Sequence, residues 1–165
     1  MATNFPNSVD AFTNPISNDS LNSPSHSLQH ANANDAIEAV EDYLLNGYAW
    51  TSYTPVISSA SGVFFVLTIN HAVYAKIGKI CHVNLQYTMT SVGTASGVVF
   101  FTLPFTAKRS NAGVGVGREV AATGSMLQVA FYGGGTTSVG VAQYDNAASV
   151  GASYTHVVSL TYEIA

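Results

Sequence analysis

From residue 50 to the end, the sequence is a succession of short segments rich in β-branched and aromatic residues, with no helical periodicity between them. Apolar residues occupy every second position in HVNLQYTM and HVVSLTYEI, which is the spacing of half-buried strands. Stretches rich in Gly, Ser and Asn separate the segments, and we interpret SSASG, SVGTASG, NAGVGVG, FYGGGTT and DNAASVG as turns. A parallel sheet is disfavoured, because it needs helices between its strands. The sequence predicts a mainly-β fold, an antiparallel jelly-roll-like β-sandwich over residues 48–165.

Residues 1–32 show neither the period of a strand nor that of a helix. Prolines interrupt this segment, polar residues fill most of it, and large apolar residues stand singly. Alone it would bury too little apolar surface to offset its chain entropy. It is either an extended arm that docks on a neighbouring protein or a leader with chance hydrophobic residues, and we favour the arm. The candidate contact residues of the arm are Phe5, Pro6, Val9, Phe12, Pro15, Ile16 and Leu21.

A short helix is predicted over residues 33–47. Asn32 or Asn34 is a suitable N-cap, acidic residues in the first turns suit the positive end of the helix dipole, and Gly47 ends the helix. Three apolar residues recur at steps of three and four, the a and d spacing of a coiled coil: Ile37, Val40 and Leu44. This stripe either meets identical helices around an axis or packs on the chain's own sheet.

Charge is scarce and unevenly placed. Only 8% of the residues are charged, whereas 47% are hydrophobic, which favours a surface partly buried against other subunits. Residues 1–47 contain six acidic residues and no lysine or arginine, so we expect neither nucleic acid nor an anionic membrane as a partner. No apolar run long enough to span a membrane and no secretory signal pattern is present. Cys81 stands alone and is expected to be a small buried hydrophobic residue.

Motifs that carry chemistry are missing from the sequence. There is no GxSxG, HExxH or paired-cysteine motif, and GVGVG lacks the lysine and the strand–loop–helix context of a phosphate-binding loop. We therefore expect no enzymatic activity, no catalytic residue and no cofactor. His26 and His30 would gather a metal only if three chains converged on a helical backbone there. Pro24 and the nearby serines disfavour such a helix, so no metal site is predicted.

Aromatic residues cluster where the predicted sandwich begins, at Tyr48, Trp50 and Tyr53. Such a cluster either stacks on sugar rings or plugs the end of the sandwich, and the plug is the more common arrangement. The remaining histidines, His71 and His82 among them, have no acidic neighbours in sequence.

Four stretches between residues 4 and 107 share a resemblance. They are the leader NFPNSVDAFTNPISNDSLNSPSHSLQHANANDAIEAVED, followed by YAWTSYTPVI, YAKIGKICHVNLQYTM and VVFFTLPFTA. The leader resembles a recurrent N-terminal motif of virion structural proteins of tailed bacteriophages, and the other three look like the β-sandwich that often follows it. Members of this group are capsid decoration (cement) proteins, head fibres, and tail-fibre or minor tail proteins, and they commonly form trimers.

The resemblance implies a homotrimer on the outer surface of a virion, most simply a decoration protein that stabilises the head. In that case the arm residues bind the major capsid protein, or alternatively a tail or baseplate protein, and the helix stripe forms the trimer interface. The alternative function is a tail-fibre or receptor-binding protein that recognises a host polysaccharide, which exposed aromatic residues on loops far from the arm would favour. A polysaccharide-degrading enzyme is disfavoured because the predicted sheet holds only three acidic residues and no visible carboxylate pair.

Overall fold

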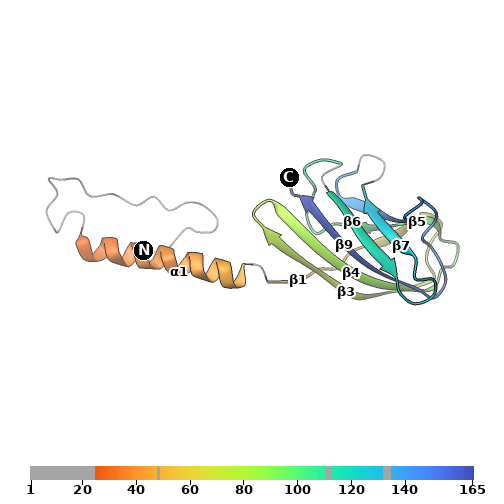
Figure 1. Cartoon of the computed structure of the whole chain (residues 1–165), viewed down its shortest axis with the longest axis horizontal. Coiled ribbons are helices and arrows are strands. Elements are labelled where there is room, and N and C mark those ends of the chain that lie inside the picture. The colour runs from red at the N-terminus through yellow and green to blue at the C-terminus, as the bar shows by residue number, and fades with distance from the viewer. Residues whose placement is uncertain (1–24, 48, 111–112, 132–134) are drawn as a thin grey trace. The chain divides into compact units, whose positions relative to one another are not determined.

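The computed structural model describes residues 25–47, 49–110, 113–131 and 135–165 (Figure 1). The chain divides into two compact units, one up to Ala49 and the other over Trp50–Ala165. The first unit contributes helix α1 (His26–Asn46), and the second is a β-domain. Within the described ranges, no helix combines the length and the apolar character needed to cross a membrane.

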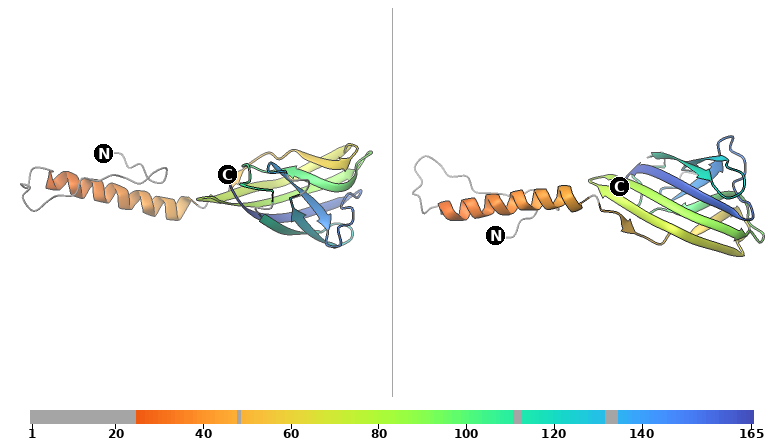
Figure 2. Two further views of the ribbon diagram at one scale, coloured as in Figure 1. Left: turned by 90° about the horizontal axis from the view of Figure 1, so that it is seen from above. Right: turned by 60° about the horizontal axis from the view of Figure 1, so that its bottom comes forward.

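The β-domain is built from antiparallel strands only, as far as the described residues go. Its strands are β1 (Thr51–Ser52), β2 (Ile57–Ser61), β3 (Val66–Ile77), β4 (Ile80–Ser91), β5 (Ser96–Thr102), β6 (Gly113–Glu119), β7 (Met126–Ala130), β8 (Ser138–Gln143) and β9 (Tyr154–Glu163). They form one continuous hydrogen-bonded sheet in the order β1-β3-β4-β9-β6-β7-β8-β5-β2. The sheet curls around its own inner face, as the two views in Figure 2 show.

The predicted mainly-β antiparallel fold is confirmed, but the jelly-roll arrangement is not. A jelly roll has two stacked sheets, whereas this domain has one curled sheet. Alternation in sequence reports which face of a strand is buried and carries no information on which strands are neighbours. Two of the predicted turns are also wrong, because most of SSASG lies in β2 and GVGVG lies in β6.

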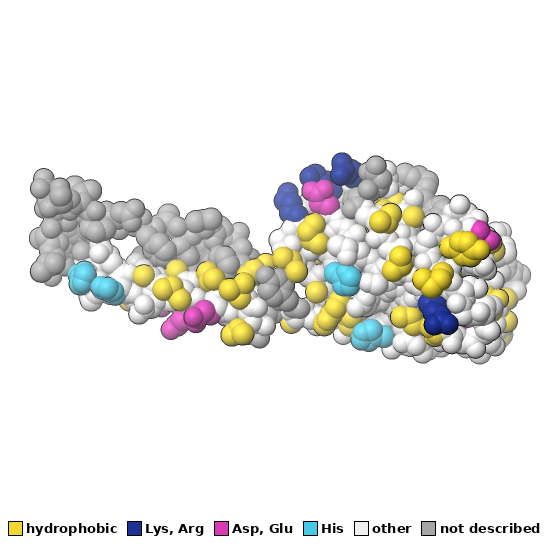
Figure 3. Space-filling model, in the orientation of Figure 1, with side chains coloured by type: hydrophobic (Ala, Val, Ile, Leu, Met, Phe, Trp, Pro, Cys, Tyr) yellow, Lys and Arg dark blue, Asp and Glu magenta, His cyan; other side chains and the backbone are white. Residues whose placement is uncertain are grey.

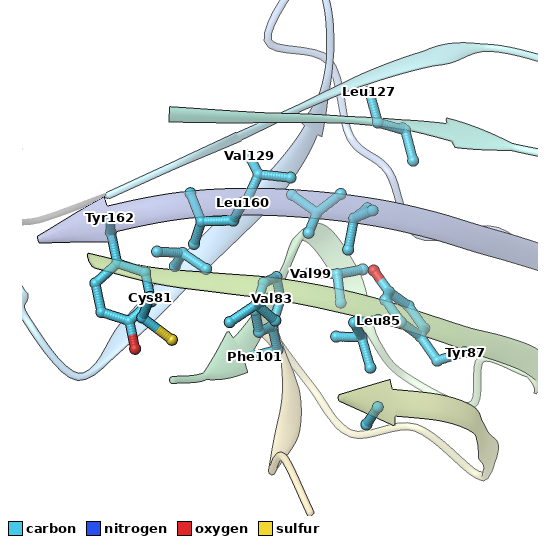
Figure 4. Packing of buried hydrophobic residues seen from close by; sticks show 14 of the residues in the cluster. Cys81, Val83, Leu85, Tyr87, Val99, Phe101, Leu127, Val129, Leu160 and Tyr162 are labelled. Carbon is cyan, nitrogen blue, oxygen red and sulfur yellow. The ribbon is translucent and has the colours of Figure 1, made fainter. Parts of the chain in front are cut away.

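The core lies on the concave face of the sheet and follows the period-2 pattern of the central strands (Figure 4). In β4 every second residue from Cys81 to Met89 is buried, and in β9 the same holds from His156 to Tyr162. The opposite side of the core comes from β5, β7 and β8, with Val99, Phe101, Leu127, Val129, Val139 and Val141. Each of these side chains contributes roughly 1.5–3 kcal/mol by leaving water. Cys81 is a free, fully buried thiol, as predicted.

Strand β6 alternates inward glycines with outward valines. A Cβ atom at Gly113 or Gly115 would overlap backbone carbonyl oxygens of β9, so the two backbones approach too closely for any other residue. Val114 and Val116 face outward and are 78% and 65% exposed. The glycines of GVGVG therefore serve strand packing, and the segment is no phosphate-binding loop.

Candidate functional site

Helix α1 begins at His26, so the predicted start at residue 33 is wrong. Its N-cap is Ser25, whose carbonyl oxygen accepts the first helical hydrogen bond from the Gln29 N–H at 3.0 Å. Pro24 directly precedes this cap in sequence. A proline at that position costs no helical hydrogen bond, because a residue before the N-cap donates no N–H within the helix. The Ser, His and Asn residues that follow lower helix propensity by only some tenths of a kcal/mol each.

The two predicted N-caps, Asn32 and Asn34, lie inside α1. The predicted end of the helix at Gly47 is confirmed, since the Gly47 N–H donates to the Tyr43 carbonyl oxygen at 2.8 Å. The helix thus has 21 residues and is longer than predicted.

Exposed residues at heptad spacing form a stripe along α1, and Leu28 and Leu45 are exposed outside it. Ile37 and Leu44 are each 56% exposed and Val40 is 41% exposed. With Ile37 at heptad position a, Val40 is at d and Leu44 at the next a. The same register continues toward the N-terminus. The α1 stripe, in order, is His26, His30, Ala33, Ile37, Val40 and Leu44, and all six residues are exposed.

The acidic residues of α1 lie mostly away from the stripe. Asp35 and Asp42 occupy f positions and Glu38 a b position, so these three side chains belong to the far side of the helix. The flanking e and g positions hold Ser27, Gln29, Asn34, Ala36, Glu41 and Tyr43, of which only Glu41 is charged. Copies of this helix can therefore meet stripe to stripe without opposing rows of acids.

The N-terminal end of the stripe is a histidine pair. His26 and His30 are both exposed, and their Nε2 atoms lie 3.1 Å apart. The rings meet edge to face, with centroids 4.5 Å apart and an interplanar angle of 86°. The sequence argument against a helical backbone at these residues is wrong. Among the described residues of one chain, no group of three or more His, Cys, Asp or Glu side chains is placed to hold a metal ion.

The β-domain contains a buried carboxylate at the end of β6. Glu119 is 1% exposed and is surrounded by backbone N–H groups. Its oxygens accept N–H hydrogen bonds from Ala121 at 2.7 Å, Ala122 at 2.9 Å, Thr155 at 3.0 Å and Gly124 at 3.2 Å, and a further one from Thr123. Burial opposes the charge, but these N–H groups outweigh it and hold the pKa of Glu119 well below its usual range. The carboxylate ties the β6–β7 loop to the start of β9.

His156 lies opposite Glu119 on β9 and is fully buried. Its Nδ1 lies 2.8 Å from the hydroxyl oxygen of Tyr87, and its buried Nε2 has no hydrogen-bond partner among the described residues. Burial lowers the pKa of His156 from 6.5 to about 4, although the nearby Glu119 charge opposes that shift. Tyr87 is also fully buried, and burial raises its pKa. Because solvent reaches none of the three side chains, we interpret this cluster as structural.

Sequence reasoning missed this cluster, because His156 has no acidic neighbour in sequence and meets Glu119 only through strand pairing. The available signal was the position of Glu119, a lone acid at a strand end followed by the small residues of the 120–125 loop.

The predicted aromatic cluster is divided. Tyr53 packs inward against Tyr74, with ring centroids 6.1 Å apart, and acts as the predicted plug. Trp50 is 50% exposed and lies beside His82, with ring centroids 5.5 Å apart. Tyr48 lies outside the described residues. His82 is held by hydroxyl groups of β9, at 2.7 Å from Thr161 and 3.2 Å from Ser159.

Exposed apolar side chains gather on the loops at the end of the sheet away from β1. Val63 and Phe65, before β3, are 71% and 81% exposed, and Tyr144, after β8, is 75% exposed. A groove of about 420 Å³ lies at Val63 and Phe65, between the edge strand β2 and strand β3. Its lining consists of Ile57, Ser58, Ser59, Gly62, Val63, Phe64, Phe65 and Leu67.

Basic residues gather at the other end of the sheet, around one carboxylate (Figure 3). Lys108 Nζ lies 2.5 Å from Glu163 Oε1, and Lys79 and Arg109 are close enough to act on the same carboxylate. The hydrogen bond from Lys108 and the neighbouring cations lower the pKa of Glu163. The pair is solvent-exposed, so it contributes little to stability.

The seven predicted arm residues, from Phe5 to Leu21, lie outside the described part of the chain. Within that part, the predicted interface residues Ile37, Val40 and Leu44 share one stripe on α1, and the two leading histidines join it. We take the α1 stripe as the candidate functional site, an assembly surface. Comparison of the chain with models of known protein families, with curated proteins and with solved structures finds no match.

Proposed function

We propose that this protein is a virion structural protein of a tailed bacteriophage, which trimerises through the α1 stripe and decorates the capsid through its N-terminal arm. The bacteriophage origin is supported by the resemblance of the leader and of the three β-segments. The assembly role is supported by one observation above all, the continuous exposed stripe on α1, which itself contains no acidic residue.

Two features of α1 favour association of more than two copies. Most of the stability of a helix in a folded protein comes from packing of its apolar face, so α1 needs a packing partner. In the stripe, a β-branched residue stands at d, Val40, and a leucine at a, Leu44. Leucine at a with a β-branched residue at d disfavours a two-stranded coiled coil and favours higher-order assemblies.

Trimerisation also gives the arm a function. One arm with a few isolated apolar residues binds weakly, because each of these residues gains only the contacts of the single pocket that it fills. Three arms on one trimer bind as a unit, since the second and third binding events are intramolecular and raise the overall affinity by orders of magnitude. A decoration protein built this way holds neighbouring capsid subunits together.

The experiment that tests the assembly is light scattering on the purified full-length chain. We expect the wild type to have three times the chain mass at micromolar concentration, and Val40→Asp/Leu44→Asp to have a lower mass. Glu38→Ala is the matched control, because Glu38 lies on the same helix away from the stripe and should leave the trimer intact. A monomeric wild type would contradict the assembly role.

A second candidate function is recognition of a host polysaccharide by the β-domain. The observation that favours it is the pair of exposed aromatic side chains, Phe65 and Tyr144, on loops at the end of the sheet away from β1. Aromatic rings on exposed loops stack on sugar faces. Glycan-array binding that is lost in Phe65→Ala and Tyr144→Ala, with unchanged stability, would favour this function over decoration.

A further inference from the structure

The histidine pair lies on the same stripe as the proposed trimer contacts. His30 occupies an a position and His26 a d position of the register set by Ile37, Val40 and Leu44. Both histidines are exposed, and the backbone that carries them is helical. In a parallel trimer formed through the α1 stripe, a and d side chains point toward the axis. Six imidazoles from three chains would therefore meet at one end of the helical bundle.

From this arrangement we infer that His26 and His30 of three chains form an axial site for a divalent transition-metal ion. The inference rests on the proposed trimer. Imidazole nitrogen is a ligand that Zn²⁺, Cu²⁺, Fe²⁺ and Ni²⁺ accept well. One chain offers only two such ligands, and three chains complete the coordination sphere.

The spacing within one chain suits octahedral coordination. The two Nε2 atoms are 3.1 Å apart. With metal–nitrogen bonds of about 2.1 Å, that spacing corresponds to an N–metal–N angle of about 95°. This is close to the 90° between neighbouring ligands of an octahedron and well below the tetrahedral angle. Three such pairs fill all six positions, so the geometry favours octahedral Ni²⁺ or Co²⁺ over tetrahedral Zn²⁺.

The net charge of the first unit also favours a cation. The described residues of the first unit include four acids, Asp35, Glu38, Glu41 and Asp42, and no lysine or arginine. A trimer therefore gathers negative charge along α1, and a bound dication offsets part of the repulsion between the helices. Metal binding and helix association consequently stabilise each other.

The test uses the full-length protein without a histidine tag, treated with a chelator and titrated with Ni²⁺ by calorimetry, with the mass measured by light scattering in the same samples. We expect one Ni²⁺ per three chains. His30→Ala should weaken Ni²⁺ binding by at least about a hundredfold. Loss of a group that only hydrogen-bonds to a metal ligand already lowers metal affinity ten- to a hundredfold, and His30 is itself a ligand. His71→Ala is the matched control, since His71 is an exposed histidine on β3 outside the stripe. Bound Co²⁺ should show the weak visible absorption of an octahedral ion.

Three results would overturn the axial site, and the measured mass and Ni²⁺ stoichiometry distinguish them. A trimer that binds no more Ni²⁺ than His26→Ala/His30→Ala contradicts the metal site and leaves the proposed assembly standing. A monomer contradicts both, and its mass shows this at once. If Val40→Asp/Leu44→Asp still binds one ion per chain with wild-type affinity, each pair chelates alone and the shared axial site is wrong.

Discussion

At the scale of single residues, the buried pair of Glu119 and His156 makes the stability of the β-domain depend on pH. The pKa of His156 falls from 6.5 to about 4 on folding, so the unfolded chain takes up a proton first as the pH decreases. The contribution of His156 to the free energy of unfolding is therefore fully present above pH 6.5. It declines toward pH 4 by about 1.4 kcal/mol per pH unit, about 3 kcal/mol in all. The pKa of Glu119 is lowered as well, and its contribution is lost as the pH falls below its unfolded value of 4.5.

Urea unfolding at pH 7, 5 and 4 measures this dependence. We expect His156→Gln to remove most of the loss between pH 6.5 and 4, because no imidazole remains at this position to take up a proton in the unfolded chain. His71→Gln, at an exposed histidine, should keep the wild-type dependence. A His156→Gln protein with the same acid sensitivity as the wild type would contradict the assignment.

The glycines of β6 carry the most specific prediction at the scale of elements. Gly115→Ala places a Cβ against the Ser159 carbonyl oxygen and the Leu160 backbone in β9, and neither can move without breaking the ladder. Overpacking of this kind costs typically 1–3 kcal/mol, and we expect the upper part of that range. Val116→Ala is the control, since this neighbouring side chain is exposed and should change stability by less than about 0.5 kcal/mol. Urea midpoints that are equal for the two variants would show that β6 and β9 separate easily.

The elements also show what the sequence could predict. Strands β4 and β9 were predictable, because hydrophobic alternation depends only on which face is buried. Strand β6 was not, because glycine is typical of turns and its use here depends on how closely β9 approaches. The start of α1 was placed too late, since Ser, His and Asn have weak propensities that the rest of the helix overrides. The stripe was predicted from Ile37 to Leu44, whereas its histidine end required the observed helix.

At the scale of the whole molecule, the chain consists of two units with different requirements for folding. The β-domain, Trp50–Ala165, has its own core of fully buried side chains from β4, β5, β7, β8 and β9. The first unit contributes α1, whose apolar stripe residues stay exposed within one chain. The proposed function therefore assigns assembly and attachment to the first unit and leaves folding of the β-domain independent of both.

This division predicts the behaviour of two truncated proteins. A fragment over residues 50–165 should unfold cooperatively in urea but have the mass of a monomer, because its core is internal and the α1 stripe is gone. A protein lacking residues 1–24 should remain a trimer, since the complete α1 stripe begins at His26. On the proposed function it should no longer co-sediment with phage heads stripped of this protein, because the arm is missing.

Phe5→Ala/Phe12→Ala in the full chain should strongly weaken binding to the stripped phage heads, as large apolar anchors dominate interfaces. Undiminished co-sedimentation of the protein lacking residues 1–24 would move the attachment site to α1 or to the β-domain.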